Sequence, residues 1–269
     1  MITQTEVSKV AYKEQVSERT IEKDYVITWI LLALADSKFR NLLAFKGGTA
    51  LKKIYFPDYR YSEDLDFTLI GKTSPQNIIE EFKIVLKNLE KAQALTFALP
   101  DKKIEEREDS LTVYVEFVGP LLAKLGSRDI KIDFTLKEKL LLLVEKKPIT
   151  SFYSDSKHLH KSFKAYSLEE ILTEKLCALI GRTEPRDLYD TYFLLDLGQL
   201  DYQSVSQAFP EKAQNKKINP ERLSTILTER EAVISKMWEV RLKHQVKELP
   251  HLDKVMRKTN QYLRRYGII

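Results

Sequence analysis

Apolar and polar positions alternate along two segments, 64–69 and 128–136, in the period of two that is typical of strands. Helical spacing of apolar residues instead predicts a helix over 19–36 and a more polar helix over 75–95. A third alternating stretch over 104–118 contains a polar turn and predicts a hairpin. The first part of the chain is therefore expected to combine strands with helices.

A glycine pair joins two elements in this first part. Residues 42–45 form a short apolar run suited to a strand, and residues 49–55 have helical spacing, with Gly47 and Gly48 between them. Glycine lets a ligand approach the backbone closely, and the unpaired amides at a helix start attract anions. The junction therefore indicates a phosphate site, although a plain tight turn would also account for the glycines alone.

Two aspartates follow in the first alternating strand. Asp64, Asp66 and Thr68 share the polar face, opposite an apolar face that can be buried. Neighbouring carboxylates repel each other unless a cation lies between them, and Mg²⁺ binds carboxylates while sharing its ligand shell with substrate phosphates. The solvated face of an ordinary strand is the alternative, but the glycine junction directly before the strand favours a metal site.

The second alternating strand supplies a third carboxylate. Asp133 lies on its polar face together with Lys131 and Thr135. Two metals held across an in-line displacement need further acidic ligands, so Asp133 is the candidate third ligand. Without the first acidic strand, a surface aspartate on an edge strand would be the better interpretation.

A later helix contains a lysine in an unusual position. Ser167 and Glu170 form a capping box that predicts the helix start. Lys175 falls at the centre of the apolar stripe of this helix rather than at its margin, where a snorkelling side chain would lie. Burying an ammonium is costly unless an anion meets it, which favours a phosphate-binding Lys175 that faces a cleft.

A further helix is predicted to begin at Pro185, since proline is favoured at the first helical position. Asp187 and Asp190 are three residues apart on one face of it. Acidic side chains stabilise a helix N-terminus, so the residues alone predict a structural role for both.

Length and composition limit the possible classes of protein. With 269 residues, 43% of them hydrophobic, the chain can form one large domain or two lobes. The turn-rich stretch 145–163 predicts a boundary, with one lobe over 1–160 and a helical lobe over 161–269. No apolar run has the length of a membrane span, and the first residues lack a signal-peptide core. Cys177 is the only cysteine, which excludes an intrachain disulfide and fits a cytoplasmic protein.

Positive charge is concentrated near the end of the sequence. Residues 211–269 contain 14 Lys and Arg against 7 Asp and Glu, while the whole chain has a formal net charge of +5. Aromatic residues interleave with the basic ones at Trp238, Tyr262 and Tyr266, a pattern that can neutralise phosphates and stack on bases. A solvated helical face is an equally good interpretation.

Several ordered motifs resemble one known family. EKDYVITWIL, FKGGTALKKIY, RYSEDLDF, KIDFT, SLEEILTEKLCAL and RDLYD, which span roughly residues 22 to 192, resemble the AbiEii/AbiGii toxin family, which includes the MenT toxins. This family belongs to the DNA polymerase β-like nucleotidyltransferases. The resemblance implies an α+β fold, with a mixed sheet flanked by helices in a catalytic lobe and a helical C-terminal lobe that completes the cleft and binds the acceptor.

The resemblance also assigns roles by motif position. It implies that the glycine junction cradles the triphosphate, that three carboxylates bind two Mg²⁺ ions, and that a lysine and an aspartate of the later helices take part in catalysis. The corresponding residues are Gly47, Gly48 and Thr49 for the triphosphate, Asp64, Asp66 and Asp133 for the metals, and Lys175 and Asp187 in the helices. Arg60 and Ser62, just before the acidic strand, are carried over as phosphate or regulatory contacts.

The expected function is therefore that of a magnesium-dependent nucleotidyltransferase toxin. It would transfer NMP from an NTP to RNA, most simply to the tRNA 3′ end, and so block translation in a toxin-antitoxin and phage-defence system with a cognate antitoxin. NMP transfer to a protein or small molecule is one alternative, and non-catalytic binding of nucleotide or RNA is another.

Overall fold

The computed structural model describes all 269 residues, and the chain divides into two compact units. Unit 1 comprises Met1–Glu138 and Val144–Ala165, and unit 2 comprises Lys139–Leu143 and Tyr166–Ile269. The division near residue 165 lies five residues beyond the boundary expected from the sequence. The short segment Lys139–Leu143 belongs to the second unit although it precedes the end of the first.

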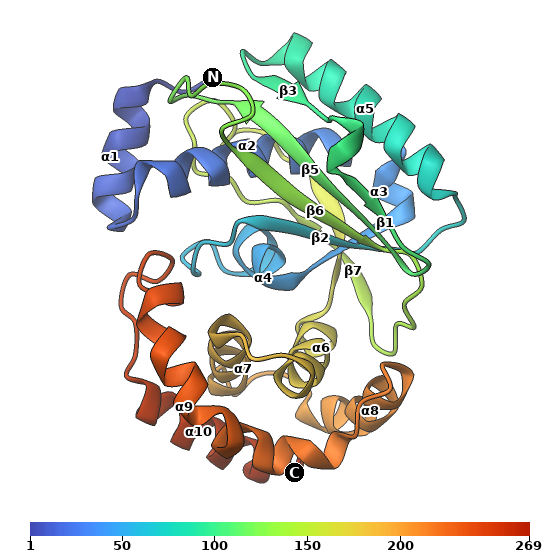
Figure 1. Cartoon of the computed structure of the whole chain (residues 1–269), viewed down its shortest axis with the longest axis vertical. Coiled ribbons are helices and arrows are strands. Elements are labelled where there is room, and N and C mark those ends of the chain that lie inside the picture. The colour runs from blue at the N-terminus through green and yellow to red at the C-terminus, as the bar shows by residue number, and fades with distance from the viewer. The chain divides into compact units, whose positions relative to one another are not determined.

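An eight-stranded mixed sheet forms the centre of unit 1, and only the last residue of β8 lies outside that unit. Its path runs β3-β5-β6-β2-β1-β8-β7, with β4 paired to β5 (Figure 1). β2 runs antiparallel to β1 and parallel to β6, so the two acidic strands are neighbours. The strands are β1 (Leu43–Lys46), β2 (Asp64–Leu69), β3 (Thr96–Ala98), β4 (Ile104–Glu106), β5 (Ser110–Val118), β6 (Asp129–Thr135), β7 (Val144–Pro148) and β8 (Ser162–Tyr166).

Helices cover the apolar face of this sheet. Phe134 of β6 stacks on Phe67 of β2, and it also contacts Phe39 from α3 and Phe82 from α5. Helix α2 packs against α3 and α5. The helical elements of unit 1 are α1 (Gln4–Glu14), α2 (Glu18–Ala35), α3 (Phe39–Leu42), α4 (Gly47–Ala50), the π-helix η1 (Leu51–Tyr55), α5 (Pro75–Ala92) and the short 3₁₀ turn η2 (Asp101–Lys103). The core thus lies on one side of the sheet, and the opposite face carries the acidic side chains.

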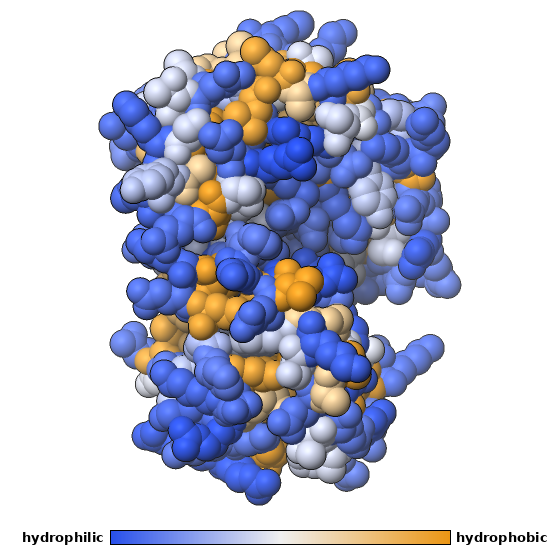
Figure 2. All heavy atoms as spheres, turned by 60° about the vertical axis from the view of Figure 1, so that its left-hand side comes forward, coloured by the Kyte–Doolittle hydropathy of each residue, from blue (hydrophilic) through white to orange (hydrophobic).

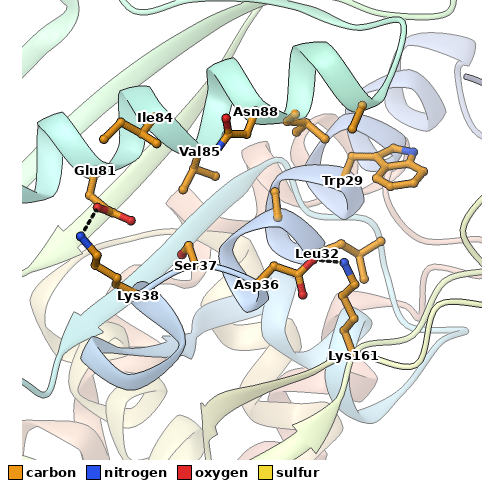
Figure 3. A pocket seen from close by; sticks show the side chains of 13 residues that line it. Trp29, Leu32, Asp36, Ser37, Lys38, Glu81, Ile84, Val85, Asn88 and Lys161 are labelled. Carbon is orange, nitrogen blue, oxygen red and sulfur yellow. Dashed lines mark hydrogen bonds and ion pairs between the residues drawn. The ribbon is translucent and has the colours of Figure 1, made fainter.

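A groove of about 410 Å³ remains open between α2 and α5. Figure 3 shows its aliphatic lining from both helices, including Val85. Ion pairs at its edges join Lys38 to Glu81 and Lys161 to Asp36. The groove is a gap between two packed helices, and none of the residues predicted to act in catalysis lines it.

Unit 2 is helical. Its elements are α6 (Leu168–Gly181), α7 (Pro185–Asp196), α8 (Tyr202–Asn215), the 3₁₀ turn η3 (Pro220–Arg222), α9 (Leu223–Leu242) and α10 (Leu252–Arg265). A fully buried ion pair joins Glu170 of α6 to Lys212 of α8 at 2.7 Å. Glu170 also accepts a bond from the Leu142 amide, and Lys212 donates to the Lys139 carbonyl. These bonds attach the segment Lys139–Leu143 to the helices of unit 2.

The predicted mixed sheet with flanking helices is confirmed. The first long helix, both acidic strands, the hairpin and the helix starts at Ser167 and Pro185 occur where the sequence places them. The stretch 145–163 is less irregular than expected, because β7 and the start of β8 lie within it. Helix α1 has no counterpart in the sequence interpretation. No helix in the structure has both the length and the apolar character that crossing a bilayer requires.

Candidate active site

Strand register brings the three candidate metal ligands onto one face of the sheet. Asp66 of β2 pairs directly with Asp133 of β6, and Asp64 pairs with Lys131. Residues paired across neighbouring strands project to the same side, and residues two apart along a strand do so as well. Lys46 of β1 pairs with Asp66 from the other side. Three carboxylates and two lysines therefore share the face that the core leaves uncovered.

The glycine turn lies against these carboxylates. Gly47 has a φ of +79°, a conformation that favours glycine, and a β-carbon at this position would lie 2.5 Å from Asp66 Oδ2. A β-carbon at Gly48 would lie 2.6 Å from Arg60 Nη2 and 3.4 Å from Ser62 Oγ. The structure thus places both glycines, Asp66, Arg60 and Ser62 in one small region.

Thr49 is buried directly behind this turn, and its hydroxyl donates to the backbone carbonyl of Asp64. The bond ties the start of the helical segment to the start of the acidic strand. The side chain is thereby engaged in holding β2, so any contact between Thr49 and a triphosphate would come from its backbone amide.

The acidic face has the chemistry of a divalent cation site. The pKa of Lys131 reflects this: desolvation lowers it, but the hydrogen bond to Asp133 and the charges of Asp133, Asp64 and Asp66 raise it above its ordinary value overall. A positive charge is therefore favoured at this place. No three acidic, histidine or cysteine side chains converge as a preformed metal cage, and Asp133 is bonded to Lys131 and Thr112. Carboxylate oxygens are the ligands that Mg²⁺ prefers, so the donor set fits that ion.

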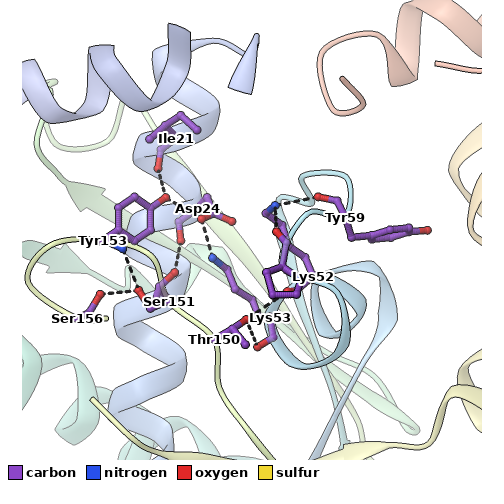
Figure 4. A network of polar contacts seen from close by, with 11 residues as sticks. Ile21, Asp24, Lys52, Lys53, Tyr59, Thr150, Ser151, Tyr153 and Ser156 are labelled. Carbon is purple, nitrogen blue, oxygen red and sulfur yellow. Dashed lines mark hydrogen bonds and ion pairs between the residues drawn. The ribbon is translucent and has the colours of Figure 1, made fainter. Parts of the chain in front are cut away.

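A buried polar network supports the segment after the glycine turn (Figure 4). Lys53 of η1 forms an ion pair with Asp24 of α2 at 2.6 Å, and both side chains are 2% exposed. Tyr153 donates to Asp24 at 2.7 Å, and Thr150 donates through its amide and its hydroxyl to the Lys53 carbonyl, each at 2.8 Å. Burial raises the pKa of the Tyr153 hydroxyl well above its ordinary value, so it remains a donor.

Sequence reasoning did not assign Asp24 or Lys53 a role. The EKDY stretch carries Asp24, but its partner is 29 residues away and becomes apparent only in the folded chain. The sequence signal for Asp24 was weak, because this residue directly follows Glu22 and Lys23 in the charged first half of the helix.

The buried ammonium of Lys175 meets carboxylates from the next helix. Lys175 Nζ lies 2.8 Å from Asp187 Oδ1 and 2.6 Å from Asp190 Oδ2, and both aspartates are fully buried. Arg182 Nε lies 2.7 Å from Asp187 Oδ2. Burial alone would raise the pKa of Asp187, but Lys175 and Arg182 lower it below its ordinary value. Asp187 and Asp190 are thus the anions that a buried lysine needs, and both lie in unit 2. A catalytic role for Lys175 and Asp187 stays a prediction.

The aromatic residues of the basic region pack inward. Trp238 is buried and donates to the Pro250 carbonyl at 3.0 Å, Tyr262 bonds to Asp196, and Tyr266 stacks on Tyr202. Trp238 and Tyr262 are therefore not available to stack on bases, because the helical periodicity places them in the core of unit 2, while Tyr266 is half-buried. Most of the basic side chains remain exposed, Lys212 excepted, and Figure 2 shows a mostly hydrophilic face of the molecule.

A match to a known family of nucleotidyltransferases defines the class of this chain. The sequence profile of the nucleotidyl transferase AbiEii toxins of type IV toxin-antitoxin systems matches residues 29–263. The chain therefore belongs to the AbiEii toxin family, which confirms the resemblance seen in its motifs and the predicted class of enzyme.

Solved structures support the fold assignment. MenT4, a nucleotidyltransferase toxin from Mycobacterium tuberculosis H37Rv, has a TM-score of 0.73 at 16% identity, covering 100% of this chain and 91% of that one. JHP933 from Helicobacter pylori has a TM-score of 0.56 at 18% identity, covering 93% of each chain. No match was found among curated protein sequences. At these identities the likeness shows a shared fold.

Proposed function

We propose that this toxin transfers NMP from an NTP to the 3′ end of tRNA, with Mg²⁺ as cofactor and pyrophosphate as leaving group. Blocked tRNA would stop translation, as expected for the toxin of a phage-defence pair neutralised by a cognate antitoxin. The observation that carries this proposal is the pairing of Asp66 with Asp133 beside Gly47, which sets carboxylates for metals next to backbone amides for phosphates.

Each element of this face has a distinct role in the proposal. Asp64, Asp66 and Asp133 would hold two Mg²⁺ ions, which would supply activation of the attacking hydroxyl and charge neutralisation of the leaving pyrophosphate. The amides that follow Gly47 would bind phosphate oxygens, and the Arg60 guanidinium beside Gly48 supplies a charged donor. Catalysis would then consist mainly of positioning and electrostatic stabilisation.

The acceptor would use the basic surface of unit 2. Exposed cationic side chains from α9, α10 and the loop between them can neutralise phosphates without a stacked base, and the nearby rings of Trp238 and Tyr262 are buried. They are Arg241, Lys243, Lys247, Lys254, Arg257, Arg264 and Arg265. This surface supports an RNA acceptor.

Incubation of the protein with each labelled NTP, Mg²⁺ and total tRNA tests reaction, donor and acceptor together. We expect label on tRNA with the wild type and none with the D64N/D66N variant, which keeps side-chain size but removes two charges. If label appears on protein or on a small molecule while tRNA stays unlabelled, that molecule and not tRNA is the acceptor. Retained tRNA binding without transfer from any NTP would indicate a non-catalytic binder.

A pair of charge variants tests the acceptor surface separately. R264A/R265A should weaken tRNA binding several-fold. The slope of log binding constant against log salt concentration should also become shallower, by roughly one for each phosphate that is no longer neutralised. K87A/K91A removes two exposed charges from α5 and serves as the matched control. Equal effects in both variants would contradict a localised acceptor surface.

A further inference from the structure

Lys131 is a cation built into the acidic face. It lies on β6, two residues before Asp133, and pairs across the sheet with Asp64. Its Nζ donates to Asp133 Oδ2 at 2.5 Å. The proposed reaction uses all three carboxylates around it and gives the lysine itself no task.

The contact with Lys131 occupies the carboxylate that is proposed as the third metal ligand. Thr112, which pairs with Asp133 across β5 and β6, donates to Asp133 Oδ1 at 2.5 Å. Lys131 takes the other oxygen. Each Asp133 oxygen therefore has a donor, and the ammonium supplies the positive charge that a bound ion would otherwise supply.

The two donors differ in how readily they can leave. Thr112 has a short side chain on a strand that is paired on both sides, with Glu105 and Asp133 as its neighbours, so its hydroxyl has little freedom. The Lys131 side chain is 38% exposed and has a flexible four-carbon stem, so its ammonium can move into water. The structure thus combines a fixed bond that orients Asp133 with a removable one that neutralises it.

We propose that Lys131 is an internal counter-ion that holds one carboxylate oxygen of Asp133 until a divalent cation displaces it. This inference rests on the proposed function, since it requires the acidic face to be the metal site. While no metal is bound, Lys131 relieves repulsion among the three carboxylates. It also lowers the affinity of the acidic face for a metal ion that arrives without a nucleotide. Metal that arrives with the triphosphate brings additional ligands and overcomes this competition.

Binding of Mn²⁺ to the nucleotide-free full-length protein tests the proposal, with titration calorimetry and the electron paramagnetic resonance signal of free Mn²⁺ as readouts. Lys131→Met keeps the length of the side chain and removes its charge. Loss of one positive charge a few ångströms from the ion should tighten Mn²⁺ binding by about tenfold, with a smaller effect at high salt. Lys131→Arg keeps the charge and should bind Mn²⁺ nearly as the wild type does.

Lys103→Met is a matched control on the same sheet. Lys103 lies 2.8 Å from Asp129 Oδ2, so this variant also removes a lysine paired with a β6 carboxylate. Asp129 is four residues from Asp133, about 13 Å along the strand, which is too far to affect the proposed metal site strongly. Its Mn²⁺ affinity should equal that of the wild type.

The outcomes separate this inference from the proposed function. Tighter binding in Lys131→Met alone supports the counter-ion, whereas unchanged or weaker binding overturns it and leaves the metal site intact. Absence of Mn²⁺ binding in every variant would also overturn the counter-ion, and only an additional absence of labelled NMP transfer by the wild type would overturn the proposed function. If Lys131→Met does not fold, Lys131→Gln provides the same comparison.

Discussion

The glycine turn allows a prediction in which backbone strain and steric contact can be separated. In Gly47→Ala, the new β-carbon would occupy a residue with a φ of +79° and would lie 2.5 Å from Asp66 Oδ2, 3.2 Å from its Cγ and 3.3 Å from its Cβ. A left-handed backbone conformation costs a non-glycine residue about 1 to 2 kcal/mol. The contact also lies inside the normal van der Waals distance, so the Asp66 carboxylate must move.

Two further substitutions divide these effects. Gly126 has a φ of +86°, but a β-carbon there would approach no closer than 3.4 Å to Glu116 Oε2, so Gly126→Ala carries the strain with ordinary contact. Gly48→Ala adds a contact of 2.6 Å with Arg60 Nη2 but has no positive φ. Chemical denaturation should show a loss of about 1 to 2 kcal/mol for Gly126→Ala and at least as large a loss for Gly47→Ala, which adds the contact with Asp66.

Activity should distinguish the same variants. Displacing a catalytic group by about 1 Å costs on the order of 100-fold in rate, so we expect a loss of that order in labelled NMP transfer by Gly47→Ala. Gly126→Ala should retain nearly full activity, and Gly48→Ala should lose activity through Arg60 with little loss of stability. A fully active Gly47→Ala variant would refute the argument that the turn positions Asp66.

Three other predictions concern buried charge. Removing either partner of the fully buried Glu170 and Lys212 pair, as in E170Q or K212M, should cost about 3 to 5 kcal/mol in chemical denaturation, and the double variant should lose less than the sum. Burial lowers the pKa of Lys52 to about 8, below its unfolded value of 10.5, so the unfolded state binds more protons between these values. The free energy of unfolding should therefore rise from pH 8 to 10, by at most about 1.4 kcal/mol per pH unit, and K52M should lack this rise; equal slopes would contradict the assignment. The lowered pKa of Asp187 stabilises the fold above its unfolded pKa of 3.8 and ceases to do so as pH falls through the lower folded value. D187N should thus be less stable than the wild type at pH 7, and the difference should shrink toward pH 3; a constant difference would argue against the ion pairs as its cause.

Local periodicity was sufficient to predict the strands of the site. Alternation along 64–69 and 128–136 identified both acidic strands and showed which residues share a face. The direct pairing of Asp66 with Asp133 could not be read from the sequence, because the register between strands 67 residues apart depends on the fold of the whole sheet. The contribution of Lys131 was missed for the same reason, although its place on the polar face was apparent.

Sequence signals for helix starts were reliable where both hydrogen-bonding partners are close in sequence. They were incomplete where a distant residue competed for one of the partners. Ser167 accepts the bond from the Glu170 amide that the capping box predicts. The Glu170 side chain does not reach back to the Ser167 amide, which instead donates to the Leu143 carbonyl. Glu170 is drawn to Lys212, which lies 42 residues later, because a buried ammonium offers a stronger partner than an amide.

The carboxylates that the motifs single out fall into two physical groups. Asp133 is 27% exposed, and Asp64 and Asp66 are also only partly buried, so these groups can exchange one cationic partner for another. Asp187 and Asp190 are fully buried and bonded to Lys175, and a buried charge without its partner is costly. We therefore expect ligand exchange on β2 and β6, while Asp187 acts by holding Lys175, whose side chain keeps a 10% exposed surface.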